Sequence, residues 1–380
     1  MMINSLELKN FKSFEELNID LGKLTVLTGL NGSGKSSILH AITLLKQSLE
    51  SNIKEECLVL NGSWLTLGNS DDILYERAQE NQIEINLNLD NECVKFKCNA
   101  IPEIDILPLE ITGSILSAHE ALSHFQLIQA DRLIPAIQYM KMNSIDISKK
   151  NLGSRGEFTV DFLKRNEDLK VSTGRHYPKE RLSNPEDKEF MKSIAPTDSL
   201  LDLTTEWLQL LSPGARPKLQ SVDLADLTSL RYEYKGILGD VGSRDYRPSN
   251  VGFGLTYSLP ILVSCLAAKK GALLLLENPE AHLHPRGQSA LGLLLSLCAA
   301  DGVQIIVETH SDHLLNGIRL AAKRKYINSA DVNVHFFSRD PRTGITGCES
   351  PRLLDNGRFD DWPNGFFDEW GNALEELLEE

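Results

Sequence analysis

Residues 24–49 read LTVLTGLNGSGKSSILHAITLLKQSL, and this stretch indicates the fold class of the chain. Its middle, Gly29–Ser36, matches the pattern G-x-x-x-x-G-K-[ST]. The apolar run before it is typical of a buried strand, and the run after it has the apolar spacing of a helix. A glycine-rich turn between a strand and a helix predicts a phosphate-binding P-loop, and therefore an α/β fold.

The P-loop predicts a nucleotide site made largely of backbone groups. Glycines let successive N–H groups turn toward a phosphate chain, and the start of the following helix adds positive potential. Lys35 is expected to reach the β- and γ-phosphates, and Ser36 is expected to ligate Mg²⁺. The residues expected to contact ATP in this segment are Asn31, Gly32, Ser33, Gly34, Lys35, Ser36 and Ser37.

A second signal lies at the end of the fully apolar run Leu273–Leu276. Continuous apolar strands between helices are typical of a parallel sheet that is covered on both faces. Glu277 follows this strand, and an acid in that place is where such enzymes hold Mg²⁺. We therefore expect Glu277 to be the second magnesium ligand. The alternative is a strand that simply ends at a polar turn.

A third signal is the apolar run 303–308 followed by Thr309-His310-Ser311. A neutral imidazole at this point can donate one hydrogen bond, so His310 is expected to sense whether a γ-phosphate is present. The alternative is a histidine that caps the helix beginning near Ser311.

In this order, the three motifs resemble the ABC-type ATPases of the SMC and RecF kind. The first 40 residues are similar to the opening of that class. The stretches ENPEAHLHP, ETHSDHLLNGIR and WPNGFFDEW resemble segments of compact prokaryotic ATPases often called AAA or overcoming-lysogenization-like. The resemblance covers most of 247–370 as well, and 100–240 only patchily. It implies an α/β P-loop NTPase fold of the ABC/SMC-head type.

The resemblance also implies a signature segment, SNVGFG, which in such proteins serves the nucleotide of the partner subunit. Its expected phosphate contacts, made through backbone N–H groups at a helix start, are Ser249, Asn250, Gly252 and Gly254. This implies a homodimer or higher homo-oligomer that closes around ATP and Mg²⁺. A glycine-rich turn that merely starts a core helix is the alternative.

Two features depart from the family's pattern. The family usually has Asp then Glu after the apolar strand, whereas this chain has Glu277 then Asn278, and an amide is a poor proton acceptor. We therefore expect slow hydrolysis that depends on Glu277, with Glu280 as the substitute base. The alternative is a water molecule that His310 or the partner subunit positions. The second departure is the unidentified γ-phosphate glutamine, for which the candidates are Gln47, Gln79 and Gln82.

Two further groups of polar residues admit alternative interpretations. Glu280, His282 and His284 are spaced like metal ligands, but the P-loop context favours a switch or inter-subunit loop over a zinc site. Arg132 follows the apolar run in FQLIQADRLIP. It is either a phosphate or inter-domain contact, or part of a structural salt bridge.

Composition places limits on the class of protein. The chain has 380 residues, 41% hydrophobic and 24% charged, which fits a folded domain with a sizeable insertion. No run approaches the roughly 20 apolar residues that span a bilayer, and the start is not a signal peptide. We therefore expect a cytoplasmic protein without a membrane partner. The net charge of −14 disfavours general nucleic-acid binding but leaves room for a local basic groove.

The expected organisation has four segments. They are an N-terminal ATPase lobe with the P-loop (1–105), a largely helical insertion (106–240), a C-terminal ATPase lobe with signature, Glu277 and His310 (241–345), and an acidic C-terminal segment (346–380). Periodicity further predicts a hairpin over 82–98 and a helix over 200–211.

The function that the resemblance implies is an ATPase that regulates a partner effector, a nuclease or toxin, in prokaryotic antiviral defence. No acidic cluster of the kind a toprim nuclease needs follows His310, so we expect the effector activity on another chain. One alternative is a RecF-like DNA-repair ATPase that binds DNA directly. Another is a non-hydrolysing, nucleotide-gated scaffold, which Asn278 would favour.

Overall fold

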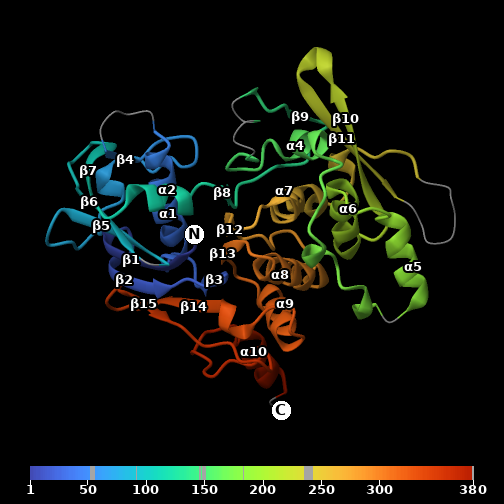
Figure 1. Cartoon of the computed structure of the whole chain (residues 1–380). Coiled ribbons are helices and arrows are strands. Elements are labelled where there is room, and N and C mark those ends of the chain that lie inside the picture. Colours follow the sequence, from blue (N-terminus) through green and yellow to red (C-terminus); the bar gives the residue numbers. More distant parts are fainter. Residues whose placement is uncertain are drawn as a thin grey trace. The chain divides into compact units, whose positions relative to one another are not determined.

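A computed structural model describes residues 1–51, 56–90, 92–144, 147, 151–182, 184–234 and 243–378 (Figure 1). The chain divides into two compact units, each assembled from separate stretches of sequence. The first unit comprises Met1–Ser123, Gln304–Asp312 and Arg319–Glu380, and the second comprises His124–Val303 and His313–Ile318. In the part of the chain that the structure describes, no helix is both long and apolar enough to cross a membrane.

The first unit contains an antiparallel sheet with the strand order β2-β1-β5-β6-β7-β4. Its strands are Phe14–Asp20, Ile3–Phe11, Gln82–Leu89, Cys93–Asn99, Ile106–Thr112 and Cys57–Val59, in that order. The expected hairpin is confirmed, because β5 and β6 pair antiparallel with Ile85 opposite Phe96. Both of these side chains are buried, as the period of two in the sequence predicts.

The P-loop strand β3 (Leu24–Gly29) pairs in parallel with β13 (Gln304–Glu308) and with β14 (Val332–Arg339). An edge strand, β15 (Thr346–Glu349), is antiparallel to β14. The helix α1 (Lys35–Leu49) follows the P-loop and contacts both β3 and β13. This parallel pairing confirms the expected α/β class. Other helices that begin in this unit are α2 (Ile115–Ala121), α9 (Asp312–Lys323) and α10 (Glu369–Leu378).

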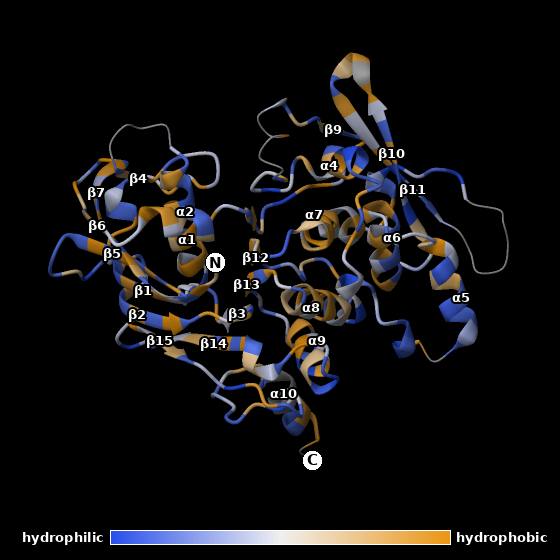
Figure 2. Cartoon of the chain, in the orientation of Figure 1, coloured by the Kyte–Doolittle hydropathy of each residue, from blue (hydrophilic) through white to orange (hydrophobic). Residues whose placement is uncertain are grey.

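The second unit contains the parallel pair β8 (Phe125–Ile128) and β12 (Leu273–Glu277). Its helices α7 (Phe253–Ala267) and α8 (Pro285–Ala300) are apolar over most of their length (Figure 2). The helix α6 (Leu200–Leu211) packs against both and ends where the sequence predicted, at Ser212. Packing among these helices buries the long apolar runs that the sequence contains between residues 253 and 300.

A second sheet in this unit has the strand order β10-β11-β9. Its strands are Ala215–Val222, Leu227–Tyr234 and Gln138–Met140, in that order. In Figure 1, β10 and β11 form a long hairpin. The second unit also contains the helices α4 (Thr159–Arg165) and α5 (Pro185–Ile194).

Strand pairing crosses the expected boundaries at 105 and 345, and the expected boundary at 240 lies outside the described residues. β7 lies in the range assigned to the insertion, yet it pairs with β6 of the first unit, and β8 in the same range pairs with β12. β15 lies in the predicted acidic tail but pairs with β14. The range 106–240 is also mixed rather than largely helical. Strand pairing joins residues that are far apart in sequence, and local periodicity does not reveal such partners.

Candidate functional site

The turn between β3 and α1 depends on three glycines with positive φ. Gly29, Gly32 and Gly34 have φ values of 135°, 74° and 90°. A Cβ on Gly29 would collide with the carbonyl oxygen of Phe337, and one on Gly34 would lie 2.7 Å from Cζ of Phe14. A Cβ on Gly32 would meet nothing within 4 Å. The backbone at Gly32 therefore borders open space, as the approach of a phosphate chain requires.

The other expected ATP contacts in the P-loop differ in exposure. Asn31 is exposed, whereas Ser33 and Ser37 are buried. The hydroxyl of Ser33 donates to the carbonyl oxygen of Leu30 at 2.7 Å. The side chain of Ser33 thus stabilises the turn, so any phosphate contact at this residue would come from its backbone.

Lys35 is folded back onto the P-loop. Its Nζ donates to the carbonyl oxygens of Gly29 (3.1 Å) and Leu30 (2.8 Å), and it lies 3.8 Å from Oε1 of Glu308. Burial lowers the pKa of Lys35, and the Glu308 carboxylate opposes this change. A buried cation held by carbonyls and one carboxylate is suited to exchange these partners for an anionic ligand.

Sequence analysis did not select Glu308, which the structure brings to this site. Its side chain is 5% exposed, and it is hydrogen-bonded to the hydroxyl of Ser36. Burial raises the pKa of Glu308, and Ser36 and Lys35 oppose that change. Within the described residues, its buried Oε2 has no hydrogen-bond partner. The signal was present in the sequence, because Glu308 ends an apolar strand just as Glu277 does.

His310 lies two residues beyond this carboxylate and is exposed. Partial burial and the charge of Lys35 lower the pKa of His310, so the imidazole is neutral at pH 7. Thr309 contributes the hydroxyl that accepts the Ser311 amide at 3.1 Å. This bond stabilises the turn that precedes α9. The first unit therefore gathers a cation, a hydroxyl, a carboxylate and an imidazole around one P-loop.

The second predicted carboxylate, Glu277, ends β12 in the second unit and is half-buried. Its Oε2 accepts the amide N–H of Ala130 at 3.0 Å. The next residue, Asn278, has a φ of 42°, a left-handed conformation that asparagine adopts more readily than most residues. Glu277 is therefore anchored to the segment that follows β8, and the chain turns sharply directly after it.

Glu280 is 8% exposed and interacts electrostatically with Arg132, as Glu277 does. Arg132 is itself buried and donates to the carbonyl oxygens of Glu277 and Asn278. Asp131, the neighbour that could have formed a local salt bridge with Arg132, pairs with Arg155 instead. Arg132 is thus a structural contact to the main chain after β12.

The expected signature segment lies at the start of α7. Ser249 and Asn250 are exposed in the short turn before this 15-residue helix, and Gly252 occupies its N-cap position. A Cβ on Gly252 would meet nothing within 4 Å, whereas one on Gly254 would lie 2.5 Å from the carbonyl oxygen of His282. The segment therefore combines an accessible helix N-terminus with one closely packed glycine.

Among the candidate glutamines, Gln47 has an amide that is already used within the first unit. It donates to the carbonyl of Val59 and accepts the amides of Trp64 and Leu65, and it is 5% exposed. Gln47 is therefore a structural residue. Gln82 lies in β5, and Gln79 is exposed just before that strand.

Gln129, which the sequence analysis missed, is better placed than these three. It directly follows β8, and β8 runs parallel to β12 with Ile128 opposite Leu276. The carboxyl ends of parallel neighbours lie at the same edge of a sheet, so Gln129 and Glu277 occupy equivalent positions. Only the pairing of β8 with β12 reveals this.

His282 and His284, which are spaced like metal ligands, make contacts of another kind. The ring of His282 packs against Phe253 and Tyr257, with centroids 4.6 and 5.0 Å apart. Nδ1 of His284 accepts the amide of Arg286 and caps α8. Across the described residues, no group of His, Cys, Asp and Glu is arranged to hold a metal ion by itself.

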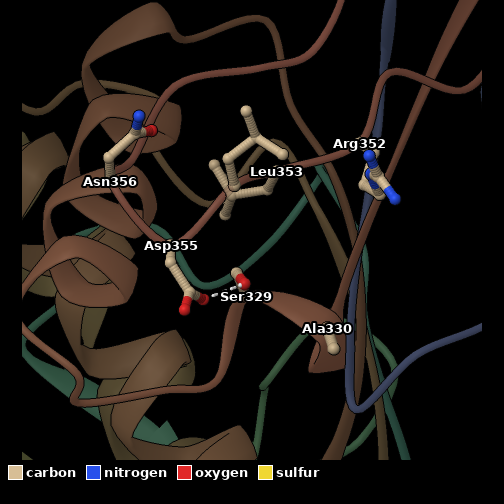
Figure 3. Close-up of a pocket in the computed structure, with 7 residues that line it drawn as sticks. Ser329, Ala330, Arg352, Leu353, Asp355 and Asn356 are labelled. Carbon is tan, nitrogen blue, oxygen red and sulfur yellow. Dashed lines mark hydrogen bonds between the residues drawn. The ribbon is translucent and has the colours of Figure 1, made fainter.

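A surface pocket of about 550 Å³ lies elsewhere in the first unit (Figure 3). Residues 329–330 and 352–356 line it. Asp355, the carboxylate in this pocket, accepts the hydroxyl of Ser329 and pairs with Lys325, and both partners lower its pKa. Its charge is thus already balanced, and the pocket contains no residue of the P-loop.

Family models of known proteins match long stretches of this chain. A family model described as "AAA ATPase domain" matches residues 1–212. A second, described as "AAA domain, putative AbiEii toxin, Type IV TA system", matches residues 146–316, and a third, of unknown function (DUF3696), matches residues 327–377.

Several individual proteins are also similar to this chain. The OLD nuclease of Thermus scotoductus is 23% identical over 94% of this chain and 68% of its own length. The DNA replication and repair protein RecF of Clostridioides difficile is 34% identical over 18% of this chain and 20% of its own. The Pyrococcus furiosus Smc head domain with an extended coiled coil, solved bound to the C-terminal domain of ScpA, is 18% identical. That likeness covers all of both chains with a TM-score of 0.52, and it confirms the expected SMC-head fold.

Proposed function

The chain belongs to the AAA ATPase domain family, and from this premise we propose that it binds MgATP and hydrolyses it slowly as a molecular switch. One observation carries the proposal: Lys35, Ser36 and Glu308 converge beside an open P-loop backbone. A buried ammonium and a row of N–H groups at a helix start are suited to a triphosphate.

Magnesium is proposed from the chemistry of the two oxygen donors that the sequence singled out. We assign its protein ligands to the hydroxyl of Ser36 and the carboxylate of Glu277, because hard cations prefer oxygen donors. When bound, Mg²⁺ would neutralise charge on the phosphates. Ser36 at the first turn of α1 and Glu277 at the end of β12 are the positions that the P-loop class uses for this purpose.

Nucleotide binding is tested with Lys35→Ala. We expect the affinity for ATP to fall by at least about 100-fold, since the variant loses the cation that faces the β- and γ-phosphates. Lys46→Ala is the matched control. Lys46 lies on the same helix, is also buried, and donates to the carbonyl of Leu122 instead. Equilibrium titration should show wild-type affinity in this control, and equal binding by Lys35→Ala would refute the site.

For hydrolysis we propose that Glu277, Glu280 and His310 act together. Asn278 occupies the usual position of the base, so Glu280 is the substitute proton acceptor and neutral His310 contacts the γ-phosphate. Glu280→Gln should lower steady-state phosphate release by about 10- to 100-fold while ATP binding persists. Unchanged release would remove Glu280 from the mechanism. Absence of turnover in the wild type, with tight ATP binding, would favour the nucleotide-gated scaffold instead.

We further propose that two copies close around two nucleotides. The exposed turn Ser249–Gly254 has the form of an anion site, and its service to a second subunit explains why it is accessible. Self-complementary pairing about a two-fold axis is the commonest form of oligomer. ATP would favour closure, because its γ-phosphate contacts both subunits and ADP lacks that contact.

The dimer is tested by mixing two inactive variants, Lys35→Ala and Gly252→Trp. Both defects fall in one composite site of the heterodimer, so the other site stays intact and partial ATPase activity should return. Lack of recovery in a verified heterodimer would contradict the shared site.

The downstream role is proposed as control of a partner effector, a nuclease or toxin, in antiviral defence. The support is similarity to a protein named OLD nuclease and to a domain described as a putative toxin. Copurification with an effector that depends on ATP would support this role. Salt-sensitive DNA binding without such a partner would favour direct action on DNA.

A further inference from the structure

Arg132, which is not one of the proposed catalytic residues, is the buried centre of a network of contacts in the second unit. Its side chain is 3% exposed, although arginine is rarely buried. Nε donates to the carbonyl of Tyr257 (3.1 Å), and NH1 donates to those of Gln129 (3.2 Å) and Glu277 (2.7 Å). NH2 donates to the carbonyl of Asn278 at 2.6 Å. One planar group thus joins the end of β8, the end of β12 and the start of α7.

Tyr257 closes this network from the helix side. The guanidinium carbon of Arg132 lies 4.2 Å from the centroid of the Tyr257 ring, a cation–π distance. The Tyr257 hydroxyl donates to the carbonyl of Ala130, and the amide of Ala130 donates to Oε2 of Glu277. The carboxylate of Glu277 is therefore oriented through a chain of contacts that begins on α7.

The same ring connects Arg132 to the exposed turn before α7. Tyr257 packs on Phe253 and on His282, with centroids 5.3 and 5.0 Å apart. His282 itself has a φ of 64°, and its carbonyl lies against Gly254. The segment after Glu277 is thus held by Arg132 at Asn278 and packs against the helix start at His282.

We propose that Arg132 is a positioning residue that sets the geometry of Glu277 relative to the start of α7. This rests on the proposed ATPase function. The left-handed backbone of Asn278 is costly, and such conformations persist where surrounding contacts determine them. Arg132 supplies two of these contacts, to the carbonyl oxygens of the two peptide groups that flank Asn278. Loss of its planar fork would leave Glu277 present but misplaced.

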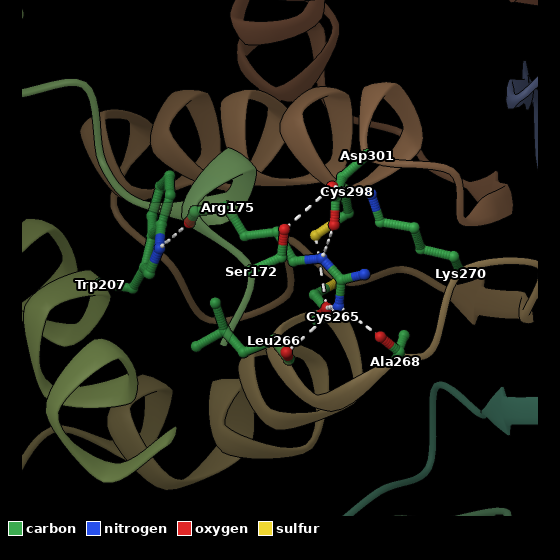
Figure 4. A network of polar contacts seen from close by, with 9 residues as sticks. All are labelled: Ser172, Arg175, Trp207, Cys265, Leu266, Ala268, Lys270, Cys298 and Asp301. Carbon is green, nitrogen blue, oxygen red and sulfur yellow. Dashed lines mark hydrogen bonds and ion pairs between the residues drawn. The ribbon is translucent and has the colours of Figure 1, made fainter. Parts of the chain in front are cut away.

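Arg175 provides a matched comparison within the same unit (Figure 4). It is 2% exposed and donates to the carbonyls of Cys265, Leu266 and Ala268, at the other end of α7. Nε also pairs with Asp301 at 2.9 Å. Arg175 therefore resembles Arg132 in burial and in bonding to main-chain carbonyls, but it touches no predicted catalytic or nucleotide-binding residue.

The experiment compares Arg132→Lys with Arg175→Lys in the full chain. Lysine keeps the charge and the aliphatic stem but lacks the planar fork. We measure the Kd for ATP with and without Mg²⁺, kcat, KM and Tm. For Arg132→Lys we expect the Mg²⁺-free Kd and KM to stay within about twofold and kcat to fall about 10- to 100-fold, the usual range for groups that orient a metal ligand. Mg²⁺ should also tighten ATP binding less than in wild type.

Arg175→Lys should lower Tm while kcat stays near wild type, because its contacts lie away from Glu277. The positioning role would be overturned if Arg132→Lys had the kcat of the wild type and the same effect of Mg²⁺ on ATP affinity. It would also be overturned if kcat fell equally in both variants and in proportion to the loss in Tm. If Arg132→Lys does not fold, Tyr257→Phe decides. It removes the hydroxyl bond to Ala130 and should lower kcat several-fold, so an unchanged kcat would overturn the proposal.

Failure of the proposed function gives a different pattern. If the wild-type protein binds ATP but does not hydrolyse it, kcat cannot be compared. The role of Arg132 is then tested by the effect of Mg²⁺ on the Kd for ATP. A wild-type protein that binds no nucleotide would overturn both proposals.

Discussion

Two buried strands of this protein end in a glutamate, and the two carboxylates have different surroundings. Glu308, after β13 in the first unit, lies 3.8 Å from the ammonium of Lys35 and is hydrogen-bonded to Ser36. Glu277, after β12 in the second unit, accepts a main-chain amide, and Arg132 binds its carbonyl oxygen. Glu308 is 5% exposed, whereas Glu277 is half-buried.

An apolar strand that ends in a glutamate can therefore serve two purposes in one protein. Glu308 balances the P-loop cation, so a phosphate ligand would compete with it for Lys35. Glu277 instead accepts the amide of Ala130 and interacts electrostatically with the buried Arg132. A carboxylate that a main-chain amide orients at the end of a strand is suited to hold a metal ion.

The largest expected effect comes from Glu277→Gln. We expect phosphate release to fall by about 100-fold or more, because an amide neither balances Mg²⁺ nor accepts a proton. ATP binding without Mg²⁺ should be retained, since Lys35 is unchanged. Single-turnover and steady-state phosphate release measure the loss. Activity near the wild-type level would transfer the metal-ligand role to another acid, with Glu308 the first to examine.

The next effect tests which glutamine belongs with Glu277. Gln129→Ala should lower phosphate release about tenfold with little change in Tm, because Gln129 occupies the position equivalent to Glu277 on the neighbouring strand. Gln47→Ala should instead lower Tm, since three main-chain partners lose their hydrogen bonds. If Gln47→Ala impairs release at unchanged Tm, the assignment of Gln129 is wrong.

A smaller effect is expected for Glu308→Gln. Removal of the carboxylate that competes for Lys35 should tighten Mg²⁺-free ATP binding by roughly two- to tenfold, a change typical of one partly screened charge. Titration at low and high salt measures it. Weaker binding in the variant would show that Glu308 assists the nucleotide rather than competing with it.

The smallest effect is on stability against pH. The pKa of Glu308 is raised, so the folded state binds its proton more tightly than the unfolded state does. The stability this provides is present at low pH and is lost as pH rises through the raised pKa. Glu308→Gln should therefore reduce the fall in Tm between pH 5 and pH 8 by a few degrees at most. An unchanged slope would contradict the raised pKa.

The P-loop, the strand that precedes it and the helix that follows it could all be predicted from the amino-acid sequence. Local chemistry is sufficient there, because glycine favours the positive φ values at 29, 32 and 34, and apolar periodicity marks the flanking elements. The same reasoning located Glu277, the start of α7 and the 82–98 hairpin. Each of these depends on residues close together in the chain.

Tertiary structure alone decided the partners of these elements. The pairing of β8 with β12 placed Gln129 level with Glu277, and the pairing of β13 with β3 brought Glu308 to Lys35, over 270 residues away in sequence. The hydrogen bonds of Arg132 exist only because three chain segments, which contain Gln129, Tyr257 and Glu277, meet around it. Long-range contacts form because distant apolar strands and helices bury one another, and no local pattern records which partner each will choose.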